Sequence, residues 1–172
     1  MFSGFRQNNL IIKFKNILIH NKFKMLNEVI YGFKKILHDV PDKFFKLTEE
    51  AVSKRPAPGK WSKKQILGHL CDSAINNYSR FIRVQFEPEP FDIRRYNQDE
   101  WVELNHYQDI SFKDIIELWI VLNRRIVHII SEIPDEKLII KCDTGNGEFY
   151  SLEYIIRDYL THMKYHLDQI LN

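Results

Sequence analysis

The stretch 61–86, WSKKQILGHLCDSAINNYSRFIRVQF, has the pattern of one long amphipathic helix. Ser62 and Gln65 have the spacing of a capping box, in which each side chain bonds a backbone N–H at the helix start. The break RPAPGK at 55–60 precedes the pattern, and the prolines of 87–90 end it. Its apolar residues recur at intervals of three and four, at Ile66, Leu67, Leu70, Ala74, Tyr78 and Phe81.

Three further ranges, 25–40, 111–133 and 151–172, show the same helical period. The polar and aromatic connection 87–110 is too long for a tight turn between antiparallel neighbours. Range 138–150 holds two short β-like runs, which predict a hairpin before the last helix. Four helices with one long crossover predict an all-α four-helix bundle. The expected core residues are Leu70, Ala74, Phe81, Trp119, Leu122, Ile126, Ile156 and Met163.

The composition is that of a globular domain, with 172 residues of which 44% are hydrophobic. The net charge of +2 conceals an asymmetry, because residues 1–24 carry +5 and the remainder −3. A slightly acidic body argues against a nucleic-acid partner. No uninterrupted apolar run of about 18 residues exists, so no membrane span is expected. Two cysteines, Cys71 and Cys142, form no disulfide framework and fit a reducing cytoplasm.

The first 24 residues are basic, and Lys13, Lys15 and Asn16 interrupt their apolar pattern. A basic amphipathic helix on a membrane surface is one interpretation. The other, which we favour, is a translated upstream stretch with Met25 as the natural start. We therefore expect residues 1–24 to lie outside the fold and 25–172 to form the domain.

The last helix, RDYLTHMKYHLDQILN at 157–172, carries His162 and His166 four residues apart, with Asp158 one turn earlier. Residues at this spacing lie on the same face, so the pair could hold one metal ion. A hydrogen-bonded core histidine is the commoner reason for a single buried imidazole. His69 lies on the polar side of its own helix, and the period leaves solvent exposure and a wet cleft equally open.

Three features, Trp61-Ser62, Gly68-His69-Leu70 and the H-x-x-x-H of 162–166, occur here in the order typical of one family. The chain from about residue 25 onward resembles the DinB-like (DinB/YfiT-like) metalloenzymes, and its crossover looks like a bacterial branch of them. The resemblance implies a four-helix bundle in which His69, His162 and His166 bind a divalent metal, zinc or nickel. Three histidines with one open position are typical of a catalytic site. Many members carry a second histidine before the last one, where this chain has Tyr165.

Other side chains are weaker candidates. Asp158 and Asp72 could each accept the second N–H of a ligating imidazole, or be solvated helix carboxylates. The crossover could line a substrate pocket or simply cover the bundle. Its candidate substrate-binding residues are Tyr96, Gln98, Trp101 and His106.

The function expected from the resemblance is that of a metal-dependent enzyme, either a thiol-dependent S-transferase or a hydrolase. The metal would activate water or a substrate thiolate at its open position. The alternative is a non-catalytic, metal-stabilised bundle acting in binding or stress response. The expected partner is a small molecule, a low-molecular-weight thiol among the candidates, with a homodimer allowed as the assembly and the cytoplasm as the location.

Overall fold

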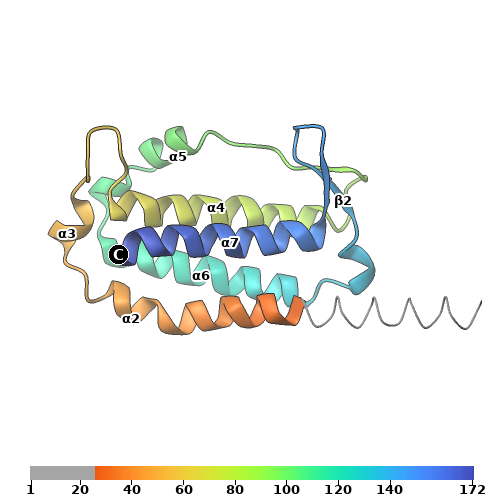
Figure 1. The fold of residues 1–172 in the computed structure, drawn as a ribbon, viewed down its shortest axis with the longest axis horizontal. Coiled ribbons are helices and arrows are strands. Elements are labelled where there is room, and N and C mark those ends of the chain that lie inside the picture. Colours follow the sequence, from red (N-terminus) through yellow and green to blue (C-terminus); the bar gives the residue numbers. More distant parts are fainter. Residues whose placement is uncertain (1–25) are drawn as a thin grey trace, which may run out of the picture.

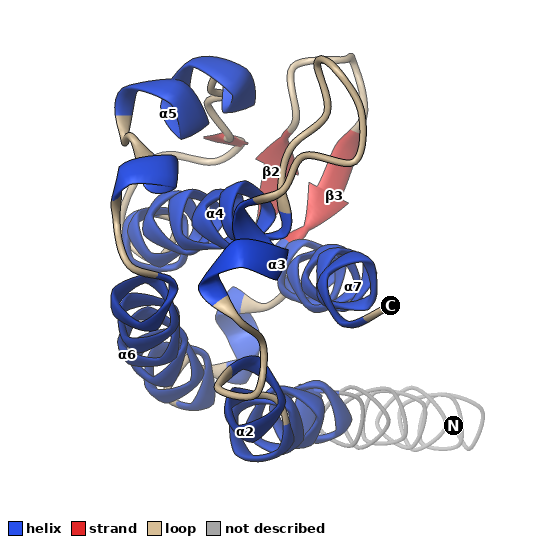
Figure 2. Cartoon of the chain, turned by 90° about the vertical axis from the view of Figure 1, so that its left-hand side faces the viewer, coloured by secondary structure: helices blue, strands red, loops and turns tan. Residues whose placement is uncertain are grey.

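The computed structural model describes residues 26–172, so the expectations for residues 1–24 lie outside the described part. Residues 26–39 form the first described helix, followed by the short α2 (Pro41–Phe44) and α3 (Glu49–Ser53). The other long helices are α4 (Lys63–Arg83), α6 (Phe112–Ser131) and α7 (Leu152–Leu171). The four long helices run alongside one another (Figure 1), and the end view shows them as a bundle (Figure 2). The predicted four-helix bundle is confirmed.

Serine side chains start three of these helices, as the sequence predicted. Ser62 accepts the N–H of Gln65 at 3.2 Å, and the Gln65 side chain accepts the N–H of Ser62 at 3.1 Å. Ser111 and Ser151 each accept a backbone N–H three residues ahead, at 3.1 and 3.2 Å. The caps satisfy N–H groups that the helix cannot, and so fix where α4, α6 and α7 begin.

Helix α4 packs against α5, α6 and α7, and more than half of its residues are buried. The predicted core is confirmed except at Leu122, which is only half-buried. Its neighbour Asn123 is fully buried instead. The Asn123 carboxamide donates to the Trp119 carbonyl at 2.8 Å and accepts the Tyr159 hydroxyl at 2.6 Å. Because both amide ends are satisfied, a polar residue can face the core where the apolar pattern pointed to Leu122.

The long crossover contains elements that the sequence analysis did not predict. They are β1 (Phe91–Asp92), α5 (Gln98–Leu104) and the 3-10 turn η1 (Tyr107–Asp109). The predicted hairpin is present as β2 (Lys141–Asp143) and β3 (Phe149–Ser151), paired antiparallel. Strand β1 pairs in parallel with β2, which joins the crossover to the hairpin. Both therefore lie on the same side of the bundle, next to α4 (Figures 1 and 2).

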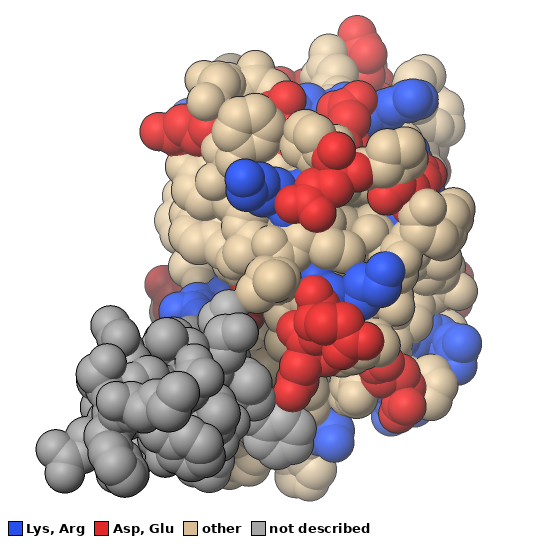
Figure 3. All heavy atoms as spheres, turned by 90° about the vertical axis from the view of Figure 1, so that its right-hand side faces the viewer, with Lys and Arg blue, Asp and Glu red and all other residues tan. Residues whose placement is uncertain are grey.

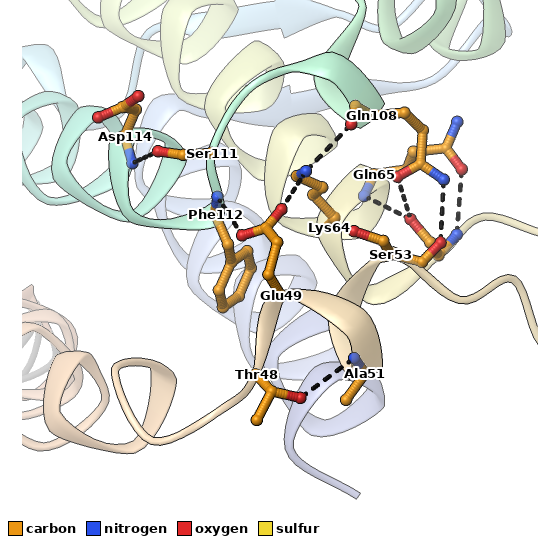
Figure 4. Close-up of polar contacts among 11 residues, drawn as sticks. Thr48, Glu49, Ala51, Ser53, Lys64, Gln65, Gln108, Ser111, Phe112 and Asp114 are labelled. Carbon is orange, nitrogen blue, oxygen red and sulfur yellow. Dashed lines mark hydrogen bonds and ion pairs between the residues drawn. The ribbon is translucent and has the colours of Figure 1, made fainter.

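A polar clamp holds the N-terminal end of α4 (Figure 4). The Glu49 carboxylate accepts a hydrogen bond from the Lys64 ammonium and another from the Phe112 N–H at 3.0 Å. Lys64, itself buried, also donates to the Gln108 carbonyl at 3.0 Å. These bonds join α3, α4, η1 and the start of α6, and His69 follows Lys64 by little more than one turn of α4.

The surface shows mixed charge. On the face drawn in Figure 3, the acidic and basic side chains of the described residues are interspersed. No helix among residues 26–172 combines the length and apolar character that a membrane span requires.

Candidate metal centre

Three histidines from two helices meet between α4 and α7. His69 comes from α4, and His162 and His166 come from α7. One ring nitrogen of each lies within 4.8 Å of the others, and Nε2 of His69 is 3.1 Å from Nε2 of His162. The rings are nearly perpendicular in each pair, with centroids 4.6 to 5.1 Å apart. The rings therefore do not stack, and the structure brings the three sequence candidates together.

The surroundings keep these imidazoles neutral. Burial lowers the pKa of His69 to about 3, with the two nearby histidines adding to the effect. Burial, then the proximity of His166, lowers the pKa of His162 to about 4. Burial also lowers the pKa of His166, although its hydrogen bond to Gln169 opposes this shift. A neutral imidazole has the free lone pair that metal coordination requires.

The spacing fits a metal ion. Ligand nitrogens about 2.0–2.1 Å from a tetrahedral zinc ion lie about 3.3 Å from one another, close to the 3.1 Å between His69 and His162. A single N–H···N hydrogen bond between the two rings would have a similar length. The third imidazole, His166, distinguishes the two cases, because a hydrogen-bonded pair has no need of it.

Aromatic rings enclose the cluster. Trp61 packs against His69 with ring centroids 5.0 Å apart. Tyr165 packs against His166 at 5.0 Å and is otherwise exposed, so the residue that departs from the family pattern lies outside the cluster. Gln169 bonds His166 Nδ1 at 2.8 Å and fixes the orientation of that ring. Gln169 was not selected as a site residue, although it follows His162 and His166 in the same column of α7.

The two candidate carboxylates lie in different surroundings. Asp72 is fully buried and accepts the Tyr107 hydroxyl at 2.6 Å and the Asn105 amide at 3.1 Å. Burial raises its pKa to about 6, against the opposing effect of the Tyr107 hydrogen bond. Asp72 thus connects the crossover to α4. Its second oxygen, Oδ2, has no hydrogen-bond partner among the described residues, and neither has Nδ1 of His69. Asp158 is exposed and lines the cavity beside His162.

A cavity of about 400 Å³ opens beside His162, between α4, the crossover, the hairpin and α7. Tyr96 and Gln98 line it, whereas Trp101 is not part of the lining and packs against Tyr96, with ring centroids 5.1 Å apart. His106 lines a different cavity, of about 360 Å³, near Trp61. The structure therefore places two of the four crossover candidates in the cavity that His162 lines.

The cavity also contains residues that the sequence analysis did not select. They come from α4, the crossover, the hairpin and α7, and include Ser73, Asn77, Arg80, Arg95 and Thr144. The available signal was the position of Ser73 and Arg80 on the same polar side of α4 as His69.

Known proteins match the chain in sequence. Residues 37–170 match the family model described as the DinB superfamily. A Halalkalibacterium halodurans protein named as a candidate metal-dependent hydrolase is 24% identical over 124 residues, covering 72% of this chain and 71% of that protein. YfiT of Bacillus subtilis, named in the same way, is 25% identical over 142 residues, covering 78% of each.

Solved structures match the fold. YfiT, described as a probable metal-dependent hydrolase with an unusual four-helix bundle topology, aligns with a TM-score of 0.68 and 23% identity, covering 88% of this chain and 83% of that one. The mycothiol-dependent maleylpyruvate isomerase aligns with a TM-score of 0.64 and 9% identity, covering 88% and 60%. The family match spans well over half of the sequence, and the chain therefore belongs to the DinB superfamily.

Proposed function

We propose that this chain is a metal-dependent enzyme in which His69, His162 and His166 bind one divalent ion beside the cavity. The observation that carries the proposal is the convergence of three neutral imidazoles from α4 and α7, with Nε2 atoms of two of them 3.1 Å apart. Three protein ligands leave a position open, which is typical of catalytic rather than structural sites. Zinc and nickel both accept imidazole ligands, and either would suit this donor set.

Residues beside the metal ligands would have separate roles at this site. The bound ion would supply Lewis acidity, lowering the pKa of water or of a thiol and polarising a substrate carbonyl. Gln169 orients His166 through its 2.8 Å hydrogen bond. Asp158 is the single acidic side chain that lines the cavity in the described part of the chain, and it lies one turn from His162. It is therefore the group placed to accept a proton there.

Hydrolysis is the first candidate reaction, because the curated relatives are named as candidate metal-dependent hydrolases. Thiol-dependent S-transfer is the second, because an open position on three imidazoles accepts a thiolate as well as water. Both cysteines of the chain are buried, and burial raises the pKa of each thiol. A thiol that reacted at this site would therefore come from a small molecule.

Metal analysis of single variants tests the site. We expect His69→Ala, His162→Ala and His166→Ala each to lose most bound metal, because two imidazoles without the third chelate poorly. His128→Ala is the matched control, since His128 is exposed on α6 and should leave metal content unchanged. Circular dichroism would show that each variant folds. Full metal occupancy in His69→Ala would refute the three-histidine site.

Activity then separates the enzyme from its rival, a non-catalytic bundle that keeps the histidines for stability. Metal-loaded protein would be screened against esters, amides and pairs of a thiol with an electrophile. Turnover that requires metal and disappears in His69→Ala supports the enzyme. Stabilisation by metal without turnover of any of these classes would favour the non-catalytic bundle.

A further inference from the structure

The cavity beside the histidines contains a second chemical feature, the guanidinium of Arg80. His69, Ser73, Asn77 and Arg80 follow one another on α4 at intervals of four, four and three residues, so they share one face of the helix. The last three line the cavity, as does His162 from α7. One face of α4 therefore leads from the histidine cluster along the cavity to Arg80.

Arg80 has few partners for a half-buried cation. Its guanidinium donates to the Arg94 carbonyl at 2.7 Å and, more weakly, to Asn77 Oδ1 at 3.4 Å. It forms no ion pair with an acidic side chain of the described residues. A guanidinium has five N–H donors and stays protonated in proteins, so Arg80 retains donors and an uncompensated charge.

The other charged groups of the cavity leave its lining positive. Arg95, which is exposed, donates to the Thr144 carbonyl at 3.0 Å. Asp158 is the acidic residue of the lining. Two arginines against one aspartate give a surplus of one positive charge before any metal is counted. A lining of this charge favours a singly charged anion over a neutral ligand.

The distance along α4 sets the length of the ligand. Arg80 lies 11 residues beyond His69, which is about 16 Å at 1.5 Å per residue. Its contact with Asn77 shows that the side chain reaches back toward the histidines. An anion on Arg80 at the level of Asn77, eight residues beyond His69, would then lie about 12 Å from that histidine along the helix axis.

We infer that the cavity binds an elongated small molecule whose carboxylate pairs with Arg80 while its reacting end lies at the histidines. A guanidinium pairs bidentately with a carboxylate or a phosphate. The carboxylate fits better, because its single negative charge balances the single surplus positive charge of the lining. The inference rests on the proposed function for the reacting end alone. The Arg80 subsite is inferred only from the hydrogen bonds of Arg80 and the charges of the cavity lining.

Two probes of equal length test the subsite on cobalt-loaded protein. 8-Mercaptooctanoate and 8-mercaptooctanol each offer a thiol to the metal, which visible absorption reports, and only the first carries a carboxylate. We expect the carboxylate probe to bind about tenfold more tightly or better, as one charge-assisted hydrogen-bonded pair predicts. Arg80→Gln should abolish this preference and keep its metal, and Arg80→Lys should retain part of it.

Arg94→Gln is the control for net charge, because Arg94 is exposed and lies outside the cavity lining. It should keep the full preference. Equal binding of the two probes to the unaltered protein, or an unchanged preference in Arg80→Gln, would overturn the inference. If the protein binds no metal, octanoate and octanol are compared by titration of the metal-free protein. Octanoate binding that disappears in Arg80→Gln would support the subsite, and equal binding would overturn it.

Discussion

Asp72 shows how much of this site depends on single buried polar atoms. The carboxylate is fully buried, and both of its hydrogen bonds, from Tyr107 and Asn105, end on Oδ1. Oδ2 has no hydrogen-bond partner among the described residues. Burial raises the pKa of this carboxyl to about 6. Ionised Asp72 is therefore an energetic cost to the metal-free fold above that pH.

Replacing Asp72 separates its charge from its hydrogen bonds. Its folded pKa of about 6 lies above the ordinary value of 3.8, so between these values the folded state binds more protons than the unfolded state. The wild type should then lose stability as pH rises through this window, by up to about 3 kcal/mol. Asp72→Asn keeps the Oδ1 acceptor and does not titrate. Its free energy of unfolding should therefore increase relative to that of the wild type as pH rises.

Asp72→Ala is the companion variant, because it leaves the Tyr107 hydroxyl without an acceptor. It should cost about 1–3 kcal/mol relative to Asp72→Asn at every pH. Urea denaturation of metal-free protein at pH 4.5, 6 and 8 measures all three proteins. A constant difference between wild type and Asp72→Asn across this range would contradict the buried charge.

At the residue scale, sequence reasoning reached the histidines by two routes. The spacing of His162 and His166 showed that they share a face, because the helical period is local. His69 required the family resemblance, because the period of α4 could not tell solvent from a covered cleft. Asp72 is covered by Asn105 and by Tyr107 of η1, and His69 packs against the histidines of α7, so the burial of both depends on segments more than 30 residues further along the chain. No local pattern encodes these contacts.

The contact between α4 and η1 depends on a missing side chain. A Cβ at Gly68 would lie 2.2 to 2.6 Å from three ring atoms of Tyr107. Gly68 thus lets the Tyr107 ring lie directly on the α4 backbone, from where its hydroxyl reaches Asp72. Gly68, the residue before His69, therefore sets the distance between α4 and η1.

Gly68→Ala tests this contact against helix propensity. Alanine is favoured over glycine inside a helix by about 1 kcal/mol, so propensity alone predicts a more stable protein. The clash with a buried ring should outweigh this gain and leave a net loss of about 1–3 kcal/mol, together with weaker metal binding at His69. Ser79→Ala, at an exposed position of α4, is the control and should show no loss. A stabilised Gly68→Ala in denaturant titrations would show that Tyr107 moves aside freely.

At the scale of elements, local signals decided which parts were predicted. The helices α4, α6 and α7 have caps and apolar stripes within their own residues, and the sequence predicted all three. Helix α5 has a cap at Asn97 and acidic residues in its first turn, but it buries only Val102 and shows no stripe. Strand β1 has two residues and exists through its pairing with β2, some 50 residues away. Such elements depend on the tertiary structure, so local patterns underpredict them.

The whole molecule assembles the site from distant segments. His69 and His162 are 93 residues apart, and the cavity beside His162 takes its walls from α4, the crossover, the hairpin and α7. A metal ion held by α4 and α7 would connect the two helices directly. Binding at the site and stability of the bundle are therefore coupled quantities, since a ligand that binds only the folded state stabilises it.

This coupling predicts how metal and pH act together on stability. The folded pKa values of His69 and His162, about 3 and about 4, lie below the ordinary value of 6.5. Between these values the unfolded state binds more protons, so metal-free protein should lose stability as pH falls below 6.5. Asp72 titrates with the opposite sign below about pH 6, so the comparison uses the Asp72→Asn background. Free metal at 100 times its Kd should add about 2.7 kcal/mol to the stability at neutral pH, and this increment should disappear on acidification as protons displace the ion.

Thermal unfolding with and without metal at pH 8, 6.5 and 5 measures both effects, with a His69→Ala/His162→Ala variant as control. That variant should show no metal increment and a weaker acid dependence, and an undiminished increment in it would place the stabilising ion elsewhere on the molecule.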